Sequence, residues 1–286
     1  MTPSAAGLPY SFSMINLVKL MPEWSWDGFD QVMDQAGTNR VELVPSMLLG
    51  MDWDQQIEEE NGPVQQALKR LMERYTVGSI QSLTYGLQIN LADELINHPE
   101  LLRRLKALRL LARTTGCSVL ILGSPGQKKQ LDPAMGSVDH KQRFIDNCSW
   151  MARILGSEVK LSLEHNTIVQ GAEYCNTLAE IIVVVKTLRE QGIANASINL
   201  DTKCLIQEFG DDVHVGELLA NHGLASLITS IQVSFDFLTR DAPHRAEDHR
   251  QLLDSAYAHD IPLSLEEFGL YENQLLPFVE AWNSII

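Results

Sequence analysis

The chain lacks the features that mark membrane and exported proteins. Its longest apolar stretches, such as residues 181–185, are far shorter than the roughly 20 residues of a membrane span. Residues 1–9 carry neither the basic segment nor the apolar segment of a secretory signal. We therefore expect a cytoplasmic protein with no membrane partner.

Positive charge and clustered cysteines are also scarce. Lys and Arg number 22 against 37 Asp and Glu, a formal net charge of −15, and no Lys/Arg-rich run occurs. Such a charge repels phosphate backbones, so no nucleic-acid partner is expected. The four cysteines have neither CxxC nor zinc-finger spacing, which argues against a disulfide framework or a thiolate metal cluster. P-loop, Rossmann and nucleophile-elbow motifs are absent too.

What the sequence does contain is an alternation of short β-branched apolar runs with longer amphipathic segments along all 286 residues. The expected strands are residues 10–17, 40–45, 77–83, 118–122, 159–164, 196–200, 230–235 and 261–266. The expected helices are residues 26–36, 62–75, 101–114, 138–155, 177–191, 213–221, 246–259 and 273–282.

Strands that alternate with helices predict a parallel sheet, and eight of each most simply close into a (β/α)8 TIM barrel. No Pro/Gly/Ser linker interrupts the pattern, so residues 1–286 are expected to form a single α/β domain. The acidic segment 47–62 is expected to lie over the barrel mouth as a loop or short helix. Residues 123–136 are expected to form a long connection of the kind that carries substrate contacts.

Three carboxylates lie at predicted strand ends. Glu164, Asp201 and Glu266 end the fifth, sixth and eighth strands, and the C-terminal ends of barrel strands carry catalytic groups. Acidic groups crowded together repel one another, and a divalent cation is the usual remedy. The alternative is that each carboxylate caps the following helix or pairs with a nearby Lys or Arg.

The order and spacing of several segments add a family resemblance. The chain resembles the xylose isomerase-like barrel superfamily, especially its sugar phosphate isomerase/epimerase and AP endonuclease 2-like members. The segments that carry the resemblance, besides the strand ends, are residues 40–45 (RVELVP), 81–86 (QSLTYG), 122–125 (LGSP), 163–166 (LEHN) and 171–174 (GAEY).

The resemblance implies one divalent metal, Mn²⁺, Mg²⁺, Co²⁺ or Zn²⁺, held by Glu164, Asp201, Gln232 and Glu266. Gln232 is a departure, because the family has a histidine there and a glutamine carbonyl is a weaker ligand than imidazole. Cys204 is a second departure, since family epimerases often have a substrate-binding histidine at that position. Related barrels commonly associate through helices or mouth loops, so a homo-oligomer is one expected state.

The activity that the resemblance implies is isomerisation or epimerisation of a small sugar or related polyhydroxy carbonyl compound. Glu164 and Glu266 would remove and return the proton beside the carbonyl, through an enediolate. One alternative is a dehydratase or lyase that acts on a keto-sugar or keto-cyclitol with the same groups. Another is a decayed, metal-free sugar-binding barrel, which Gln232 and Cys204 motivate. An AP endonuclease is disfavoured by the lack of a positive DNA surface.

Five further residues are candidates for substrate binding. Tyr85 offers an apolar wall for a carbon chain, although core packing is the alternative. Lys203 and Arg240 offer positive charge near the rim, although Lys203 can instead pair with Asp201 or Glu164. His165 faces the mouth only if the fifth strand ends at Glu164.

The fifth candidate is Ser124. It lies in a Gly-Ser-Pro-Gly turn after the fourth strand, close to Lys128. A turn of this kind with a nearby cation is a weak indication of a phosphate-binding site.

Overall fold

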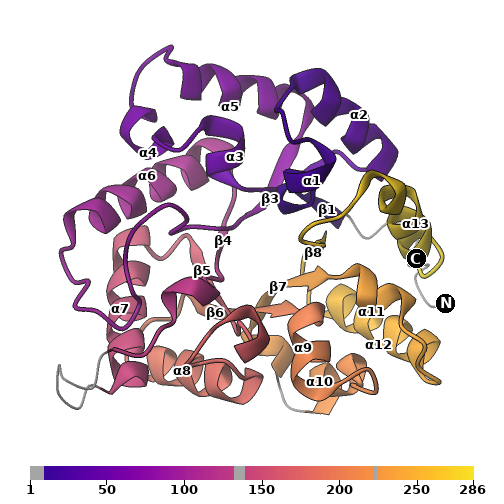
Figure 1. Cartoon of the computed structure of the whole chain (residues 1–286). Helices are drawn as coiled ribbons and strands as arrows, with labels where there is room; N and C mark the ends of the chain where they lie inside the picture. Colours follow the sequence, from indigo (N-terminus) through magenta and orange to yellow (C-terminus); the bar gives the residue numbers. More distant parts are fainter. Residues whose placement is uncertain (1–9, 132–138, 222–223) are drawn as a thin grey trace.

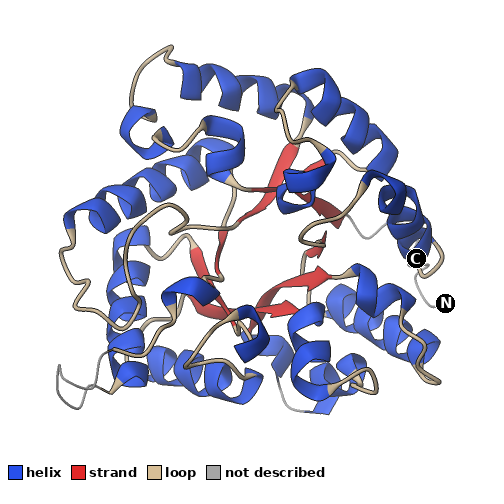
Figure 2. Cartoon of the chain, in the orientation of Figure 1, coloured by secondary structure: helices blue, strands red, loops and turns tan. Residues whose placement is uncertain are grey.

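Eight parallel strands pair in chain order and close on themselves (Figures 1 and 2). This computed structural model describes residues 10–131, 139–221 and 224–286. The ring closes because β1 pairs in parallel with β8, with Tyr10 opposite Leu263. The strands are β1 (Tyr10–Ser13), β2 (Arg40–Leu43), β3 (Thr76–Ile80), β4 (Val119–Leu122), β5 (Lys160–Glu164), β6 (Ala196–Asp201), β7 (Ile228–Val233) and β8 (Leu263–Leu265).

The predicted single (β/α)8 barrel is therefore confirmed. Most strands are shorter than the apolar runs that predicted them, because the chain turns outward once pairing with both neighbours ends. After Ser13, for example, the apolar residues continue as a single 3-10 turn over Met14–Asn16. That turn is capped by the Ser13 hydroxyl, which accepts a hydrogen bond from the Ile15 amide.

Helices surround the barrel (Figure 2). They are α1 (Leu17–Leu20), α2 (Trp26–Ala36), α3 (Pro45–Leu49), α4 (Trp53–Gln56), α5 (Pro63–Arg74), α6 (Pro99–Thr115), α7 (His140–Leu155), α8 (Leu178–Glu190), α9 (Thr202–Phe209), α10 (Val215–Asn221), α11 (Phe235–Thr239), α12 (Arg245–Ala258) and α13 (Glu272–Asn283). All eight expected helices are present within a few residues. The expected start of one at residue 138 lies outside the described residues.

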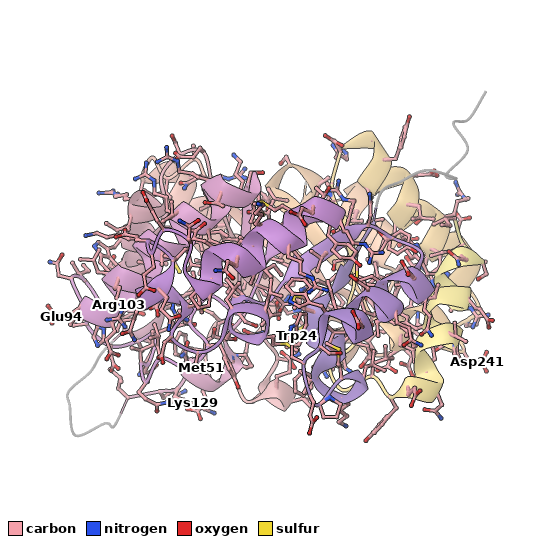
Figure 3. All side chains as sticks on the ribbon, turned by 90° about the horizontal axis from the view of Figure 1, so that it is seen from above. Trp24, Met51, Glu94, Arg103, Lys129 and Asp241 are labelled. Carbon is pink, nitrogen blue, oxygen red and sulfur yellow. The ribbon has the colours of Figure 1, made fainter. Side chains whose placement is uncertain are left out.

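The connections that follow the strands gather at one end of the barrel. Met51, which follows β2 and α3, and Lys129, which follows β4, lie toward the same edge of the molecule (Figure 3). The acidic segment 47–62 contains the end of α3 and all of α4, which confirms the expected short helix. It is anchored by the buried ion pair of Asp54 with Arg104, 3.0 Å long. Of the expected connection 123–136, residues 132–136 lie outside the described residues.

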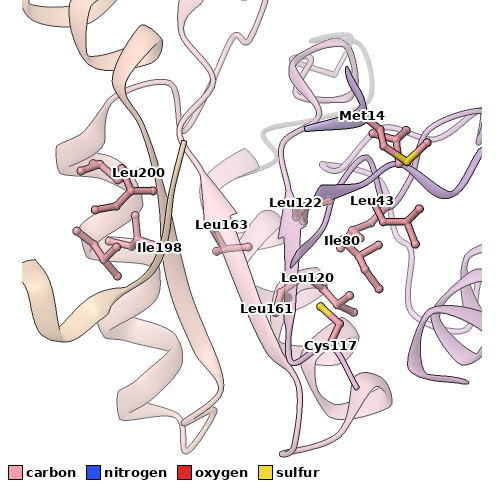
Figure 4. Close-up of a cluster of buried hydrophobic side chains, with 14 of the residues drawn as sticks. Met14, Leu43, Ile80, Cys117, Leu120, Leu122, Leu161, Leu163, Ile198 and Leu200 are labelled. Atoms are coloured by element: carbon pink, nitrogen blue, oxygen red, sulfur yellow. The ribbon is translucent and has the colours of Figure 1, made fainter. Parts of the chain in front are cut away.

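The apolar core lies between the strands and the helices. Side chains alternate along a strand, so Leu161 and Leu163 of β5 and Ile198 and Leu200 of β6 share one face (Figure 4). All four are fully buried. None of the described helices is long and apolar enough to cross a membrane.

The barrel interior is unusually polar. TIM barrels are typically filled by branched apolar side chains. Here the intervening strand positions carry buried polar side chains, which are Ser11, Ser13, Glu42, Ser79, Ser162, Glu164, Ser197, Asn199, Asp201, Ser230, Gln232 and Ser264. A buried polar group is costly unless it is hydrogen-bonded, so these residues must form networks.

Candidate active site

The four residues implied as metal ligands all lie at the C-terminal end of the barrel. Glu164 and Asp201 are the last residues of β5 and β6, Gln232 is the next-to-last residue of β7, and Glu266 follows β8 directly. Glu164, Asp201 and Gln232 are buried, whereas Glu266 is partly exposed. The hydrogen bonds divide these residues between two clusters.

Glu164, Asp201 and Cys204 form the first cluster. Their ligand atoms lie within 4.8 Å of one another. The Cys204 thiol lies 3.1 Å from Asp201 Oδ2 and 4.0 Å from Glu164 Oε1. Asp201 also caps α9, because its Oδ1 accepts a 2.7 Å hydrogen bond from the Lys203 amide. The capping role is therefore present, yet the second carboxylate oxygen remains directed at the cluster.

Glu266 and Glu42 belong to the second cluster, where amide groups bridge two carboxylates. Gln81 Nε2 donates to Glu42 Oε1 at 2.7 Å and to Glu266 Oε2 at 2.5 Å. Gln232 Nε2 donates to the same two oxygens, at 2.9 and 2.5 Å. The Ser13 hydroxyl adds a third donor to Glu266 Oε2, at 3.1 Å. Donors so arranged hold two neighbouring carboxylates in fixed positions.

Asn199 connects the two clusters. Its Nδ2 donates to Glu164 Oε2 at 3.3 Å and to the carbonyl oxygen of Gln232. Its own carbonyl oxygen accepts a 2.6 Å hydrogen bond from Ser230, which fixes the orientation of the amide. A continuous chain of hydrogen bonds therefore runs from Glu164 through Asn199 and Gln232 to Glu266.

Sequence reasoning missed the roles of Glu42, Gln81 and Asn199. The signal was nevertheless present, because polar residues recur at every second position, as in Asn199 and Asp201 or Ser162 and Glu164. In a strand buried on both faces, such a period of two indicates one face that is polar.

Burial and like charge shift the acid groups. The pKa of Glu164 is raised to about 8, first by burial and then by the charge of Asp201, while the Lys128 ammonium opposes the rise. Burial also raises the pKa of Asp201. The pKa of Glu266 is raised well above its usual value by burial and by Glu42. Carboxyl groups whose pKa values are raised in this way are suited to acid–base chemistry.

Ser124 and Lys128 do not form the weak phosphate site that their sequence suggested. Lys128 is fully buried, and its ammonium donates to the backbone carbonyl of Glu164 at 2.8 Å. The Ser124 hydroxyl lies 2.8 Å from that of Thr84, and its amide donates to Asn166. Lys128 thus holds the backbone at Glu164. Ser124 holds Asn166, which in turn donates to Glu164 Oε1 at 2.6 Å.

Two other substrate candidates have structural partners. His165 is fully buried, with Nε2 3.3 Å from Glu208 Oε2 but with no hydrogen bond to either ring nitrogen among the described residues, so its ring is closed off from solvent at the mouth. The guanidinium of Arg240 is buried against Asp248 and donates to the carbonyl of Asp211 at 2.9 Å. The expectation that Arg240 supplies a cation at the rim is therefore wrong, because burial withdraws its charge from the mouth.

Lys203 and Tyr85 differ from these two residues. Lys203 forms an ion pair with Glu267, the residue after Glu266, and not with Asp201 or Glu164 as the sequence suggested. Tyr85 is 60% exposed, so it does not belong to the core. It follows β3 on the side of the mouth and is available to contact a ligand.

The first cluster has the donor chemistry of a divalent-metal site. Two carboxylate oxygens and one sulfur converge there, and a thiolate favours Zn²⁺ or Co²⁺ over Mg²⁺. Gln232 fits the implied role less well, because both ends of its amide already bond to Glu42, Glu266 and Asn199. The structure thus fits a metal held by Glu164, Asp201 and Cys204.

Comparisons with known proteins agree on the fold. No family model and no curated protein sequence matches the chain. A 3-keto-D-glucoside 4-epimerase from E. coli superposes with a TM-score of 0.65 and 13% identity, over 98% of this chain and 99% of the epimerase. D-psicose 3-epimerase with D-tagatose, from Clostridium cellulolyticum H10, superposes with a TM-score of 0.64 and 13% identity, over 97% and 98%.

A third similar structure is the IolI protein with a bound zinc atom. It superposes with a TM-score of 0.62 and 13% identity, over 97% of this chain and 96% of that protein. At such identities the likeness establishes the fold alone. The chain therefore has the eight-stranded (β/α)8 barrel fold that the resemblance implied.

Proposed function

We propose that this protein is an isomerase or epimerase of a small sugar or related polyhydroxy carbonyl compound. The observation that carries the proposal is the pair of carboxyl groups Glu164 and Glu266. They lie at the same barrel mouth, have raised pKa values and are joined through Asn199 and Gln232.

The two carboxyl groups have different surroundings, which suits them to opposite steps. Glu164 receives hydrogen bonds from Asn166 and Asn199. Glu266 Oε2 receives them from Ser13, Gln81 and Gln232, while burial and the neighbouring Glu42 raise its pKa. We infer that one carboxylate removes the proton beside the substrate carbonyl and that the other carboxyl group returns a proton. The fixed amides hold both groups in place between the steps.

Glu164, Asp201 and Cys204 would hold one divalent metal. When bound, that cation supplies positive charge to stabilise the oxyanion that develops as the proton leaves. Tyr85 would contact the carbon skeleton of the substrate at the rim, and Lys203 and Glu267 would offer polar contacts.

The similar structures support the same reaction class. Two of them are sugar epimerases, one with D-tagatose, and a third holds zinc. These properties belong to those proteins, and their barrels share the arrangement of strands found here.

Proton exchange with solvent tests the proposal. Purified protein, loaded in turn with Zn²⁺, Co²⁺, Mn²⁺ and Mg²⁺, is incubated in D₂O with a panel of ketoses and keto-glycosides. We expect NMR to detect deuterium at the carbon beside the carbonyl of at least one sugar, since the removed proton mixes with solvent. Glu164→Gln and Glu266→Gln should each lower the rate by about 10²- to 10⁴-fold.

Glu190→Gln is the matched control, because this glutamate is exposed on α8. It should exchange at the wild-type rate. A sugar that binds without exchange under every metal would contradict the proposal and favour the sugar-binding barrel. An unsaturated product would favour the dehydratase.

A further inference from the structure

The opposite end of the barrel contains a cavity of about 480 Å³. Its lining comes from the starts of β2, β3, β4, β5 and β7 and from the turn before β8. The volume lies within the roughly 300–1,000 Å³ of small-molecule sites. This cavity is remote from the proposed catalytic end, because it lies where the strands begin.

Two cationic side chains line the cavity. Arg40 and Lys160 are the first residues of β2 and β5, and both are partly buried. Among the described residues, neither side chain has a hydrogen bond or an ion pair. The Nε atom of Arg40 is completely buried and has no partner. Buried guanidinium nitrogens normally have an acceptor, so the guanidinium of Arg40 is unsatisfied within the described residues, and its terminal nitrogens remain accessible to a ligand.

The positions of Arg40 on β2 and Gly78 on β3 place the guanidinium at the cavity. Arg40 and Glu42 are two residues apart on β2, so both side chains point toward the barrel interior. Gly78 of β3 lies close to Ser11 and to Arg40. A Cβ at this position would lie 2.2 Å from Ser11 Oγ and 3.6 Å from a terminal nitrogen of Arg40. A larger residue would therefore have to displace the Ser11 hydroxyl, and glycine avoids this clash beside Arg40.

The remaining lining supplies polar groups and one opposing charge. Thr76, Ser118 and His259 line the cavity and are exposed, so they can donate hydrogen bonds to a bound group. Thr229 also lines it, but its hydroxyl already bonds to those of Ser162 and Ser197. Asp260 is the one carboxylate in the lining and forms no ion pair with either cation among the described residues.

From these features we infer that the N-terminal end of the barrel is a binding site for a small oxyanion, namely a phosphate group held by Arg40 and Lys160. A guanidinium fork recognises two phosphate oxygens at once, and the lysine adds a second positive charge. The site is notable in a chain with a net charge of −15, because surface potential would otherwise repel an anion. The cavity admits either free phosphate or the phosphate group of a small metabolite.

Titration with inorganic phosphate tests this inference. Isothermal calorimetry on the full chain should give saturable binding with one phosphate per chain. Arg40→Gln and Lys160→Gln should each weaken the affinity at least tenfold. The thermal unfolding temperature should rise with phosphate in the wild type but much less in these two variants, since a ligand that binds the native state stabilises it. A parallel titration with a sugar phosphate distinguishes the two sources, because tighter binding would identify a metabolite.

Two control variants and a folding check test whether phosphate binds at this cavity. Lys186→Gln removes an exposed cation on α8 and should bind phosphate as the wild type does. Glu164→Gln should also retain phosphate binding, which separates this site from the catalytic end. If Arg40→Gln does not fold, as judged by circular dichroism, Lys160→Gln decides. Absence of phosphate binding, or equal affinity in the folded variants, would overturn the inference.

Discussion

Gln232 donates a 2.5 Å hydrogen bond from Nε2 to Oε2 of Glu266. The same nitrogen donates to Glu42 at 2.9 Å, so one amide group serves two carboxylates. In the family that the chain resembles, a metal-binding histidine stands at this position. Here the glutamine acts as a bridge between acidic side chains, and Cys204 lies beside Glu164 and Asp201 on the other side of the mouth.

Replacement of the bridge should destabilise the protein. Gln232→Met keeps the length of the side chain but removes the amide nitrogen that donates to Glu42 and Glu266. We expect the free energy of unfolding in urea at pH 7.5 to fall by about 3 kcal/mol, since each hydrogen bond to a charged group contributes about 1.5–3 kcal/mol. Gln251→Met is the matched control, because this amide also donates to a glutamate but on the exposed surface. A loss of equal size in both variants would contradict the bridging role.

Acidity should stabilise the metal-free protein through Glu164. The pKa of this carboxyl is about 8 in the folded chain, against about 4.3 in an unfolded one. The folded state therefore binds the proton more tightly, and this stabilisation is complete below pH ~4.3 and is lost as the pH rises through about 8. In the presence of a chelator, we expect the free energy of unfolding to fall between pH 5.5 and 8.5.

Glu164→Gln should make that decline shallower, because glutamine does not titrate. The decline will not disappear, since burial also raises the pKa of Glu266. Glu190→Gln should follow the wild-type curve. Urea unfolding across this pH range checks the prediction, and an unchanged slope in Glu164→Gln would refute it.

Cys204 should contribute a sulfur ligand to the metal. Protein loaded with Co²⁺ is expected to show a thiolate-to-cobalt absorption band in the near ultraviolet. Cys204→Ser should abolish the band and lower the Co²⁺ affinity at least tenfold. Cys117→Ser should leave both unchanged, because Cys117 lies at the opposite end of the barrel. A band that persists in Cys204→Ser would exclude this residue as a ligand.

Gly123 should be essential for the position of Glu164. A Cβ at residue 123 would lie 2.5 Å from Glu164 Oε2, so an alanine must displace the carboxylate. We expect Gly123→Ala to fold but to exchange substrate protons roughly 10²-fold more slowly, which is the effect of a misplaced catalytic group. Gly126→Ala in the same loop meets no atom within 4 Å and should retain full activity. Equal rates in the two variants would refute the steric argument.

Much of the fold could be predicted from local pattern. The segment 26–36 was predicted exactly, because Ser25 caps the helix and Gly37, with a φ of 69°, ends it. The short helix α9 was missed, because Thr202–Phe209 follows a strand without a break and its cap is Asp201, a residue that the sequence also marked as a candidate ligand. One carboxylate performs both roles because it has two oxygens.

The sequence alone determined that the strands alternate with helices, because the pattern is periodic, and that acidic residues lie at the C-terminal ends of three strands, because each one closes an apolar run. Only the tertiary structure decided which side chains meet. Closure of the barrel brings Glu42 within reach of Gln232, 190 residues away, and Ser13 within reach of Glu266, 253 residues away. Such contacts depend on strand register and on competition among neighbouring hydrogen-bond partners, which local patterns do not encode.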